Sequence, residues 1–293
     1  MKAELEGRFL IDRFNGTFFA CLAVTLLFLA AFWLIFRKRT DMTKRTAVAV
    51  LYILTFAFFF LYKYWISVDE AYSVITEEAG NGAFSWWQEL PLHLCNINLI
   101  LIPVAMFTKN RPLESFCFFI APIGAFFAML APSVGFYGYS IFVPRVFGYY
   151  LTHLLILISG PMIAMLGIFA PRFRDFPLTV AFIAGISLAV FGISMLMRAT
   201  GLNPHANYFY SIEPAPGSPL VTFHRWIPVP YLYLLPAILI LLPYMVLVTL
   251  PFEIARSGEA KAKRAGKEAP APGYTDADGT GETAEKTDEE TAV

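Results

Sequence analysis

Seven long apolar runs, separated by short polar or charged segments, dominate the chain. Most are close to 20 residues long, the length at which an α-helix crosses roughly 30 Å of hydrocarbon. They do not alternate between apolar and polar positions as the strands of a membrane barrel do. The pattern therefore predicts an all-α fold, a polytopic membrane bundle of about seven transmembrane helices. The runs lie at about 17–36, 46–62, 88–107, 113–131, 147–170, 177–197 and 230–252.

The charges between the runs predict how the bundle is oriented. Cationic segments follow the first, third, fifth and seventh runs, at 37–45, 108–114, 171–176 and 256–267, whereas the segment after the second run, 69–78, is acidic. Because lysine and arginine accumulate in cytoplasmic loops, all four cationic segments are expected inside. This places the N-terminus outside and the C-terminus in the cytoplasm.

Composition supports the membrane assignment. Hydrophobic residues make up 57% of the chain and charged residues only 15%, against about 25% charged residues in a typical soluble domain. The basic clusters are short and separate the spans, so no nucleic-acid partner is expected. We therefore predict a seven-span domain at 1–255 and a cytoplasmic tail at 256–293. The tail begins basic, ends acidic and has few large apolar residues, which predicts disorder.

Polar and reactive side chains gather at one end of the third run. In the predicted orientation, the outer half of this span carries His93, Cys95, Asn96 and Asn98, and His153 enters the fifth span at a similar depth. Polar groups inside a bilayer are costly and usually face the bundle interior or a wet cavity. The two spans are therefore expected to share a polar site near the outer face.

The types of these residues suggest nucleophilic catalysis. His93 and Cys95 are two residues apart, about 200° around a regular helix, so they cannot face each other unless the helix unwinds near Pro91. An imidazole from another helix is a better partner, which favours His153. A thiolate nucleophile with an imidazole base can form a covalent acyl intermediate.

The same residues also allow a metal site or simple packing. Cys95, His93 and His153 are acceptable zinc ligands, but the two-residue spacing suits chelation poorly and no fourth ligand stands out, so no metal is predicted. No cofactor-binding motif is found, and no cofactor is predicted. A buried free cysteine is usually a small packing residue, as we interpret Cys21 and Cys117.

The segment between the sixth and seventh runs, 198–230, is unusually long for a loop. Its aromatic stretch NYFYSIEPAP predicts an ordered structure. Two interpretations stay open, a lid that closes a cavity and a loop that only covers the bundle.

Three stretches carry a family resemblance: LPLHLCNINL in the third run, THLLILISG in the fifth and NYFYSIEPAPGSPL before the seventh. Together they resemble the YwaF family of bacterial integral membrane proteins and, more distantly, the eukaryotic transmembrane protein 164, over about residues 10–252. The resemblance implies a multi-pass protein of the bacterial cytoplasmic membrane. It also implies an acyltransferase that moves fatty acyl chains onto lysophospholipids through a cysteine thioester.

Carried to this chain, the resemblance makes Cys95 the nucleophile and His153 or His93 the base. The expected partner is a membrane phospholipid or lysophospholipid, and the sequence does not define an oligomeric state. Asn96, Asn98 or Tyr208 are of a type and expected depth to stabilise an oxyanion. The residues expected to contact substrate are Asn96, Asn98, Tyr149, Asn207 and Tyr208.

Three functions are compatible with this pattern. The first is a lipid acyltransferase or hydrolase that uses the cysteine nucleophile. The second is a transporter or receptor-like protein that binds a small polar or amphipathic ligand in an outward-facing cavity. The third is a scaffold whose polar cluster only ties helices together. Turnover separates the first from the second, because a carrier leaves its ligand chemically unchanged.

Overall fold

A computed structural model describes residues 8–80 and 82–268. Residues up to Phe252 belong to one compact unit and residues from Glu253 onward to a second. The first unit contains the helix bundle. The second contains the end of the last helix.

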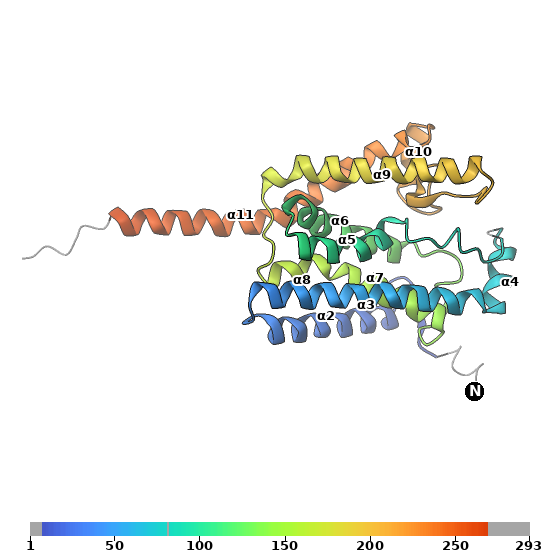
Figure 1. Cartoon of the computed structure of the whole chain (residues 1–293), viewed down its shortest axis with the longest axis horizontal. Helices are drawn as coiled ribbons and strands as arrows, with labels where there is room; N and C mark the ends of the chain where they lie inside the picture. The colour runs from blue at the N-terminus through green and yellow to red at the C-terminus, as the bar shows by residue number, and fades with distance from the viewer. Residues whose placement is uncertain (1–7, 81, 269–293) are drawn as a thin grey trace, which may run out of the picture. The chain divides into compact units, whose positions relative to one another are not determined.

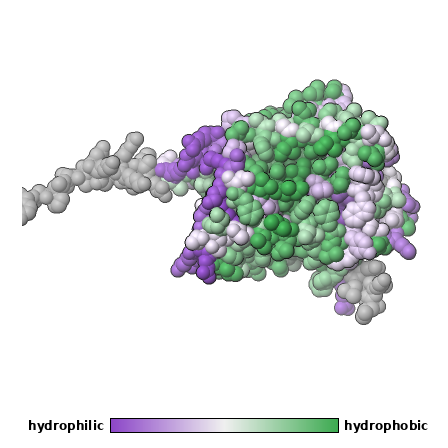
Figure 2. Space-filling model, in the orientation of Figure 1, coloured by the Kyte–Doolittle hydropathy of each residue, from purple (hydrophilic) through white to green (hydrophobic). Residues whose placement is uncertain are grey.

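The described part of the chain has six helices that are long and apolar enough to cross a membrane. This confirms the all-α, polytopic membrane bundle, whereas the orientation of its termini stays a prediction. Figure 2 shows a broad hydrophobic surface across the face in view, with more hydrophilic residues toward both ends. The six are α2 (Gly16–Phe36), α3 (Asp41–Ser67), α6 (Arg111–Leu130), the α7–α8 pair (Pro144–Leu157 and Ser159–Met165), α9 (Phe176–Ala199), and the first part of α11 (Ile238–Glu268) with the 3-10 turn η3 (Leu232–Ala237) before it.

The third predicted span is shorter than expected. Its helix, α5 (Leu94–Thr108), has 15 residues, or about 22 Å of helix. Residues 85–92 form turns instead of helix. Pro91 lies in this stretch, and a proline disfavours helical conformation in the residue before it. The predicted start at residue 88 is therefore corrected to Leu94, and His93 becomes the residue that precedes the helix.

The fifth predicted span is divided into α7 and α8 by a break at Ile158. Just after the break, Gly160 lies against the backbone of α6, where an added Cβ would stand 2.6 Å from the carbonyl oxygen of Phe118. Only glycine allows this approach without a clash. The break and the glycine together bring α8 close to α6.

Helix α6 is the centre of the bundle. It contacts α5, α7, α8 and α9, while α3 packs against α5 and α7 (Figure 1). In α6, 72% of the residues in the apolar stretch are buried, against 17% in α2. α2 therefore presents most of its surface to the surroundings, as a helix facing lipid would.

A small sheet joins the start of the chain to the loop after α6. Strand β1 (Leu10–Ile11) pairs antiparallel with β2 (Tyr139–Ser140). Asn15 then caps α2, because its side-chain oxygen accepts a hydrogen bond from the backbone N–H of Phe18 at 2.9 Å. The remaining short elements are α4 (Glu70–Glu78), η1 (Phe173–Asp175), η2 (Tyr208–Tyr210) and α10 (Leu220–Trp226).

Ion pairs that each include a buried side chain link α3, α6 and the turn before α9. Arg45 of α3 donates to Glu114 of α6 at 2.5 Å, and both side chains are less than a tenth exposed. Arg111, at the start of α6, binds both carboxylate oxygens of Asp175 just before α9. These pairs link α3 to α6 and the start of α6 to the turn before α9.

In the second unit, α11 continues as a helix to Glu268. The sequence predicts that a disordered tail starts near residue 256, so the end of the helix differs from that boundary by about one dozen residues. Residues 269–293, the rest of the predicted tail, lie outside the described residues.

Candidate functional site

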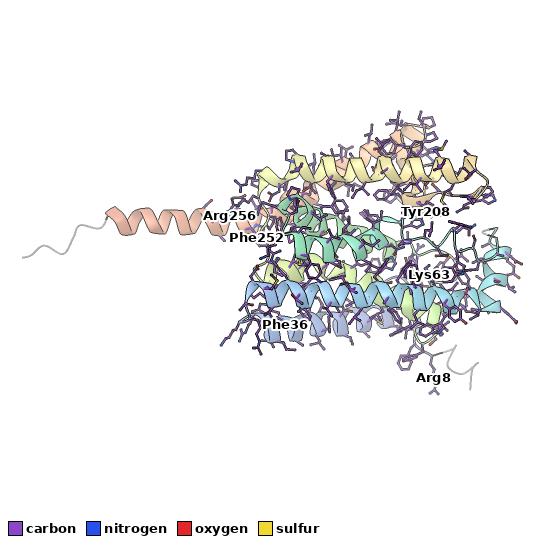
Figure 3. All side chains as sticks on the ribbon, viewed as in Figure 1. Arg8, Phe36, Lys63, Tyr208, Phe252 and Arg256 are labelled. Atoms are coloured by element: carbon purple, nitrogen blue, oxygen red, sulfur yellow. The ribbon has the colours of Figure 1, made fainter. Side chains whose placement is uncertain are left out.

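A cavity of about 1130 Å³ opens inside the first unit. Lys63 of α3 and Tyr208 of η2 both line it, and they lie at the same end of the bundle, opposite Phe36 (Figure 3). Its other walls come from α6, α9 and the segment around η3, through apolar side chains such as Ile123 and Ile183. The cavity therefore has both polar and apolar walls.

The cavity brings together seven of the eight residues that the sequence singled out. Asn98 is the exception: it is fully buried, its amide nitrogen donates to the carbonyl of Leu94 at 2.8 Å, and its side-chain oxygen has no partner. Asn98 does not line the cavity. The roles of all eight residues stay predictions. The lining residues are Cys95, His93, His153, Asn96, Tyr149, Asn207 and Tyr208.

His153 is held in one orientation by Tyr149. Its Nδ1 lies 2.7 Å from the carbonyl oxygen of Tyr149, one turn earlier on α7. Because a carbonyl oxygen only accepts, Nδ1 carries the proton of the neutral ring and Nε2 keeps the lone pair. The Tyr149 ring packs on the imidazole at 4.2 Å between centroids, and its hydroxyl donates to the carbonyl of Ala128 at 2.7 Å. This is the tautomer that a general base acting through Nε2 requires.

Cys95 lies in the first turn of α5 and is 8% exposed. Its sulfur stands 3.9 Å from the point where a Cβ on Gly124 of α6 would lie. Among the hydrogen bonds of residues 8–80 and 82–268, none joins this thiol to His93 or His153. The structure therefore places thiol and imidazoles on one cavity but does not show them in direct contact.

His93 immediately precedes α5 and does not cap it with its side chain. Its ring packs edge-on against Tyr208 at 5.8 Å and tilted against Tyr210 at 5.4 Å between centroids. The pKa of His93 is lowered to about 4, mainly by burial; Glu89 acts to raise it and Lys63 to lower it. The ring is therefore neutral near pH 7, so it can accept a proton but brings no charge to the cavity.

The long segment before η3 is ordered by its own polar side chains. The Asn207 side-chain oxygen accepts from the backbone N–H groups of Ile212 and Glu213, each at 3.1 Å. The hydroxyl of Tyr208 donates to the carbonyl of Trp87, and that of Tyr233 donates to the carbonyl of Tyr210. Asn207 and Tyr208 thus line the cavity with polar groups that already have partners.

Lys63 is the most unusual residue of the cavity, and the sequence pattern did not single it out. Its side chain is 8% exposed, and its ammonium forms an ion pair with Glu89. Its sequence signal is one lysine directly after the second apolar run, and α3 carries it because the helix continues to Ser67. A charge inside such a span is a functional-site signal by default.

The described residues include no group of three or more histidine, cysteine or acidic side chains placed to hold a metal ion.

A comparison with protein-family models identifies one match. The model of the TMEM164 family covers residues 14–249, from the start of α2 into α11. Comparisons with curated proteins and with solved structures found no match. The match agrees with the transmembrane protein 164 part of the resemblance inferred from the sequence, and it does not test the YwaF part. The chain is a multi-pass membrane protein and belongs to the TMEM164 family.

Proposed function

We propose that this protein is a lipid acyltransferase or hydrolase with Cys95 as nucleophile and His153 as base. One observation carries the proposal: the thiol and an imidazole held in the base tautomer line the same cavity. At about 1130 Å³, that cavity is slightly larger than most ligand pockets, which hold roughly 300–1,000 Å³. Its apolar wall suits an acyl chain.

The first chemical step forms a thioester. His153 Nε2 takes the thiol proton of Cys95 while the sulfur attacks the ester carbonyl carbon of a phospholipid, and the carbonyl oxygen becomes an oxyanion. The tetrahedral intermediate then collapses, the ester C–O bond breaks, and the imidazolium returns the proton to the leaving alkoxide. The products are the acylated cysteine and a lysophospholipid.

Two groups can stabilise the oxyanion. The first group is the set of backbone N–H groups in the first turn of α5, because the side chain of the N-cap residue His93 does not cap them. Free N–H groups at a helix start stabilise developing negative charge. The Asn96 side chain lines the cavity one residue after Cys95. Its NH₂ group is a donor that an oxyanion could accept from.

The second step decides between the two reactions. In a transferase, the hydroxyl of a lysophospholipid loses its proton to His153 and its oxygen attacks the thioester carbonyl. The C–S bond then breaks, and the imidazolium returns the proton to the sulfur, which regenerates the Cys95 thiol. In a hydrolase, water takes the place of that hydroxyl. Among the described residues thiol and imidazole form no hydrogen bond, so substrate binding has to bring them into reach, as happens in many enzymes.

The test compares wild type with Cys95→Ala in lipid nanodiscs. Labelled phospholipid and unlabelled lysophospholipid are supplied, acyl redistribution is followed by mass spectrometry, and the peptide containing Cys95 is searched for an acyl adduct. Cys21→Ala is the matched control, because Cys21 lies on α2 and does not line the cavity. We expect transfer and adduct in wild type and control and neither in Cys95→Ala. Transfer retained in Cys95→Ala refutes the cysteine mechanism.

A carrier that binds an amphipathic ligand is the second candidate. It is favoured by the same mixed polar and apolar lining and by the absence of a thiol–imidazole hydrogen bond among the described residues. The nanodisc experiment separates the two functions. Wild-type protein that binds lipid but leaves it unmodified and carries no adduct supports the carrier.

A further inference from the structure

Lys63 is a buried cation on the wall of the cavity. It lies on α3 four residues before the end of the helix, and its side chain is 8% exposed. Removing an ammonium from water is costly unless a partner compensates. Glu89 supplies an ion pair and takes one of the three N–H donors. The ammonium therefore keeps capacity for further oxygen acceptors.

Aromatic rings hold this ammonium in place. Its nitrogen lies 5.5 Å from the ring centroid of Phe59, 5.0 Å from that of Tyr62 and 5.7 Å from that of Phe136. All three rings are almost fully buried. Ring faces attract a cation without using its N–H groups. They position the charge while leaving its hydrogen-bonding capacity to the cavity.

Glu89 is the less constrained member of the pair. It belongs to the non-helical stretch 85–92, and its side chain is 21% exposed, more than twice as much as that of Lys63. Its carboxylate also lines the cavity. A carboxylate in this position neutralises the lysine when no ligand is bound and can be replaced by another oxyanion with little change in the net charge around the ammonium.

The surroundings select the kind of oxyanion. Lys63 lines the same cavity as His93 and His153. Apolar side chains of α6 and α9 also line this cavity. A ligand that fits both walls has an anionic head and an apolar body. In a phospholipid, only a few bonds separate the phosphate from the ester carbonyls, so a phosphate at Lys63 keeps an ester near Cys95.

We propose that Lys63 and Glu89 form an exchangeable ion pair, in which the phosphate of an amphiphile displaces Glu89 and binds the Lys63 ammonium. This site deepens the proposed function, on which its substrate orientation rests, but binding itself requires no turnover. The phosphate could belong to a lipid headgroup or be free in solution. The experiment distinguishes these two sources.

The experiment measures binding to full-length protein in detergent by native mass spectrometry. The probes are a short-chain diacylglycerophosphocholine, the diacylglycerol with the same chains, and inorganic phosphate. We expect wild type to bind the phospholipid at least about tenfold more tightly than the diacylglycerol, since hydrogen bonds to charged groups are the stronger class. Inorganic phosphate is expected to bind weakly, because it lacks the apolar body.

Two variants form a matched set, each removing one member of the pair. Lys63→Met is expected to lose the preference for phospholipid, and Glu89→Gln to keep or strengthen it. The preference of the wild type serves as an independent measurement if Lys63→Met does not fold, which a melting curve detects. Equal affinity of wild type for phospholipid and diacylglycerol overturns the proposal. So does a folded Lys63→Met variant that keeps the preference, or inorganic phosphate that binds as tightly as the phospholipid.

The outcomes also separate this site from the proposed reaction. A phospholipid preference that depends on Lys63, in a protein that forms no adduct on Cys95, leaves the phosphate site intact and rejects the cysteine mechanism. An adduct that forms at an equal rate in wild type and in folded Lys63→Met rejects the phosphate site alone.

Discussion

Gly124 of α6 gives a quantitative test of whether the thiol is the reacting group. A Cβ added to Gly124 would stand 3.1 Å from Cδ2 of Leu94 and 3.9 Å from the sulfur of Cys95. Gly124→Ala therefore leaves the sulfur in ordinary van der Waals contact and needs only a small movement of a flexible leucine. Replacing a helical glycine by alanine contributes about 1 kcal/mol, which offsets that movement. We expect unchanged stability and adduct formation within about threefold of wild type.

Gly124→Val has a different expected effect on the same sulfur. Each methyl of valine extends about 1.5 Å beyond the Cβ. A methyl directed at the sulfur reduces the 3.9 Å separation to about 2.4 Å, well inside the roughly 3.5–4.0 Å at which nonbonded heavy atoms attract. The sulfur then has to move by about 1 Å, a displacement that can cost about 100-fold in rate. We expect adduct formation on Cys95 to fall by about that factor.

The assay is the initial rate of acyl-adduct formation on the Cys95 peptide, followed by mass spectrometry in nanodiscs. Melting curves of both variants are measured alongside, because overpacking by valine can cost about 1–3 kcal/mol. A folded Gly124→Val variant that acylates Cys95 at the rate of Gly124→Ala would refute the reasoning that the position of this sulfur beside α6 determines the rate.

Three further predictions concern stability and the limits of the site. Arg45→Met leaves Glu114 buried without its cation and is expected to cost about 3–5 kcal/mol, whereas Glu114→Gln costs less because Arg45 keeps Asp41 at 2.9 Å; equal melting temperatures of the two variants would contradict this. Burial lowers the pKa of His93 to about 4, below its value of about 6.5 in the unfolded chain. The free energy of unfolding is therefore expected to fall as the pH drops from about 6.5 to 4. An equally steep fall in His93→Gln would argue against this cause. Asn98→Leu is expected to leave adduct formation nearly unchanged because Asn98 does not line the cavity, and stability nearly unchanged because its side-chain oxygen has no partner to lose. A large loss of the adduct would support its predicted contact with substrate.

The sequence predicts a helix well where the length of an apolar run alone determines it. Run length alone located α2, α6 and α9 to within a few residues, because a span of hydrocarbon requires a continuous apolar stretch. Hydropathy did not reveal the late start of α5 or the break at Ile158. The late start of α5 depends on the turns around Pro91, and the break depends on the close approach of α8 to α6. Hydropathy carries no information on either backbone conformation.

The site was predictable where it depends on depth along a span. His93, Cys95 and His153 were expected at one end of the bundle because their distances from the span ends agree, and the structure places them on one cavity. The depth of a residue along a span does not tell which neighbours its side chain meets. The sequence therefore groups Asn98 with these residues, although it is fully buried and does not line the cavity. Lys63 was missed because its importance depends on Glu89, a partner on a distant stretch of chain that no local pattern connects to it.

The pairing of β1 with β2 has a consequence for biosynthesis. Leu10 faces Ser140, so the first strand to leave the ribosome waits for a partner made about 130 residues later. At about 5–20 residues per second, this delay lasts roughly 7–26 s. During that time α2, α3, α5 and α6 are already synthesised, while the start of the chain stays unpaired. The sheet that ties the start of the chain to the bundle can therefore form only after α6 has been made.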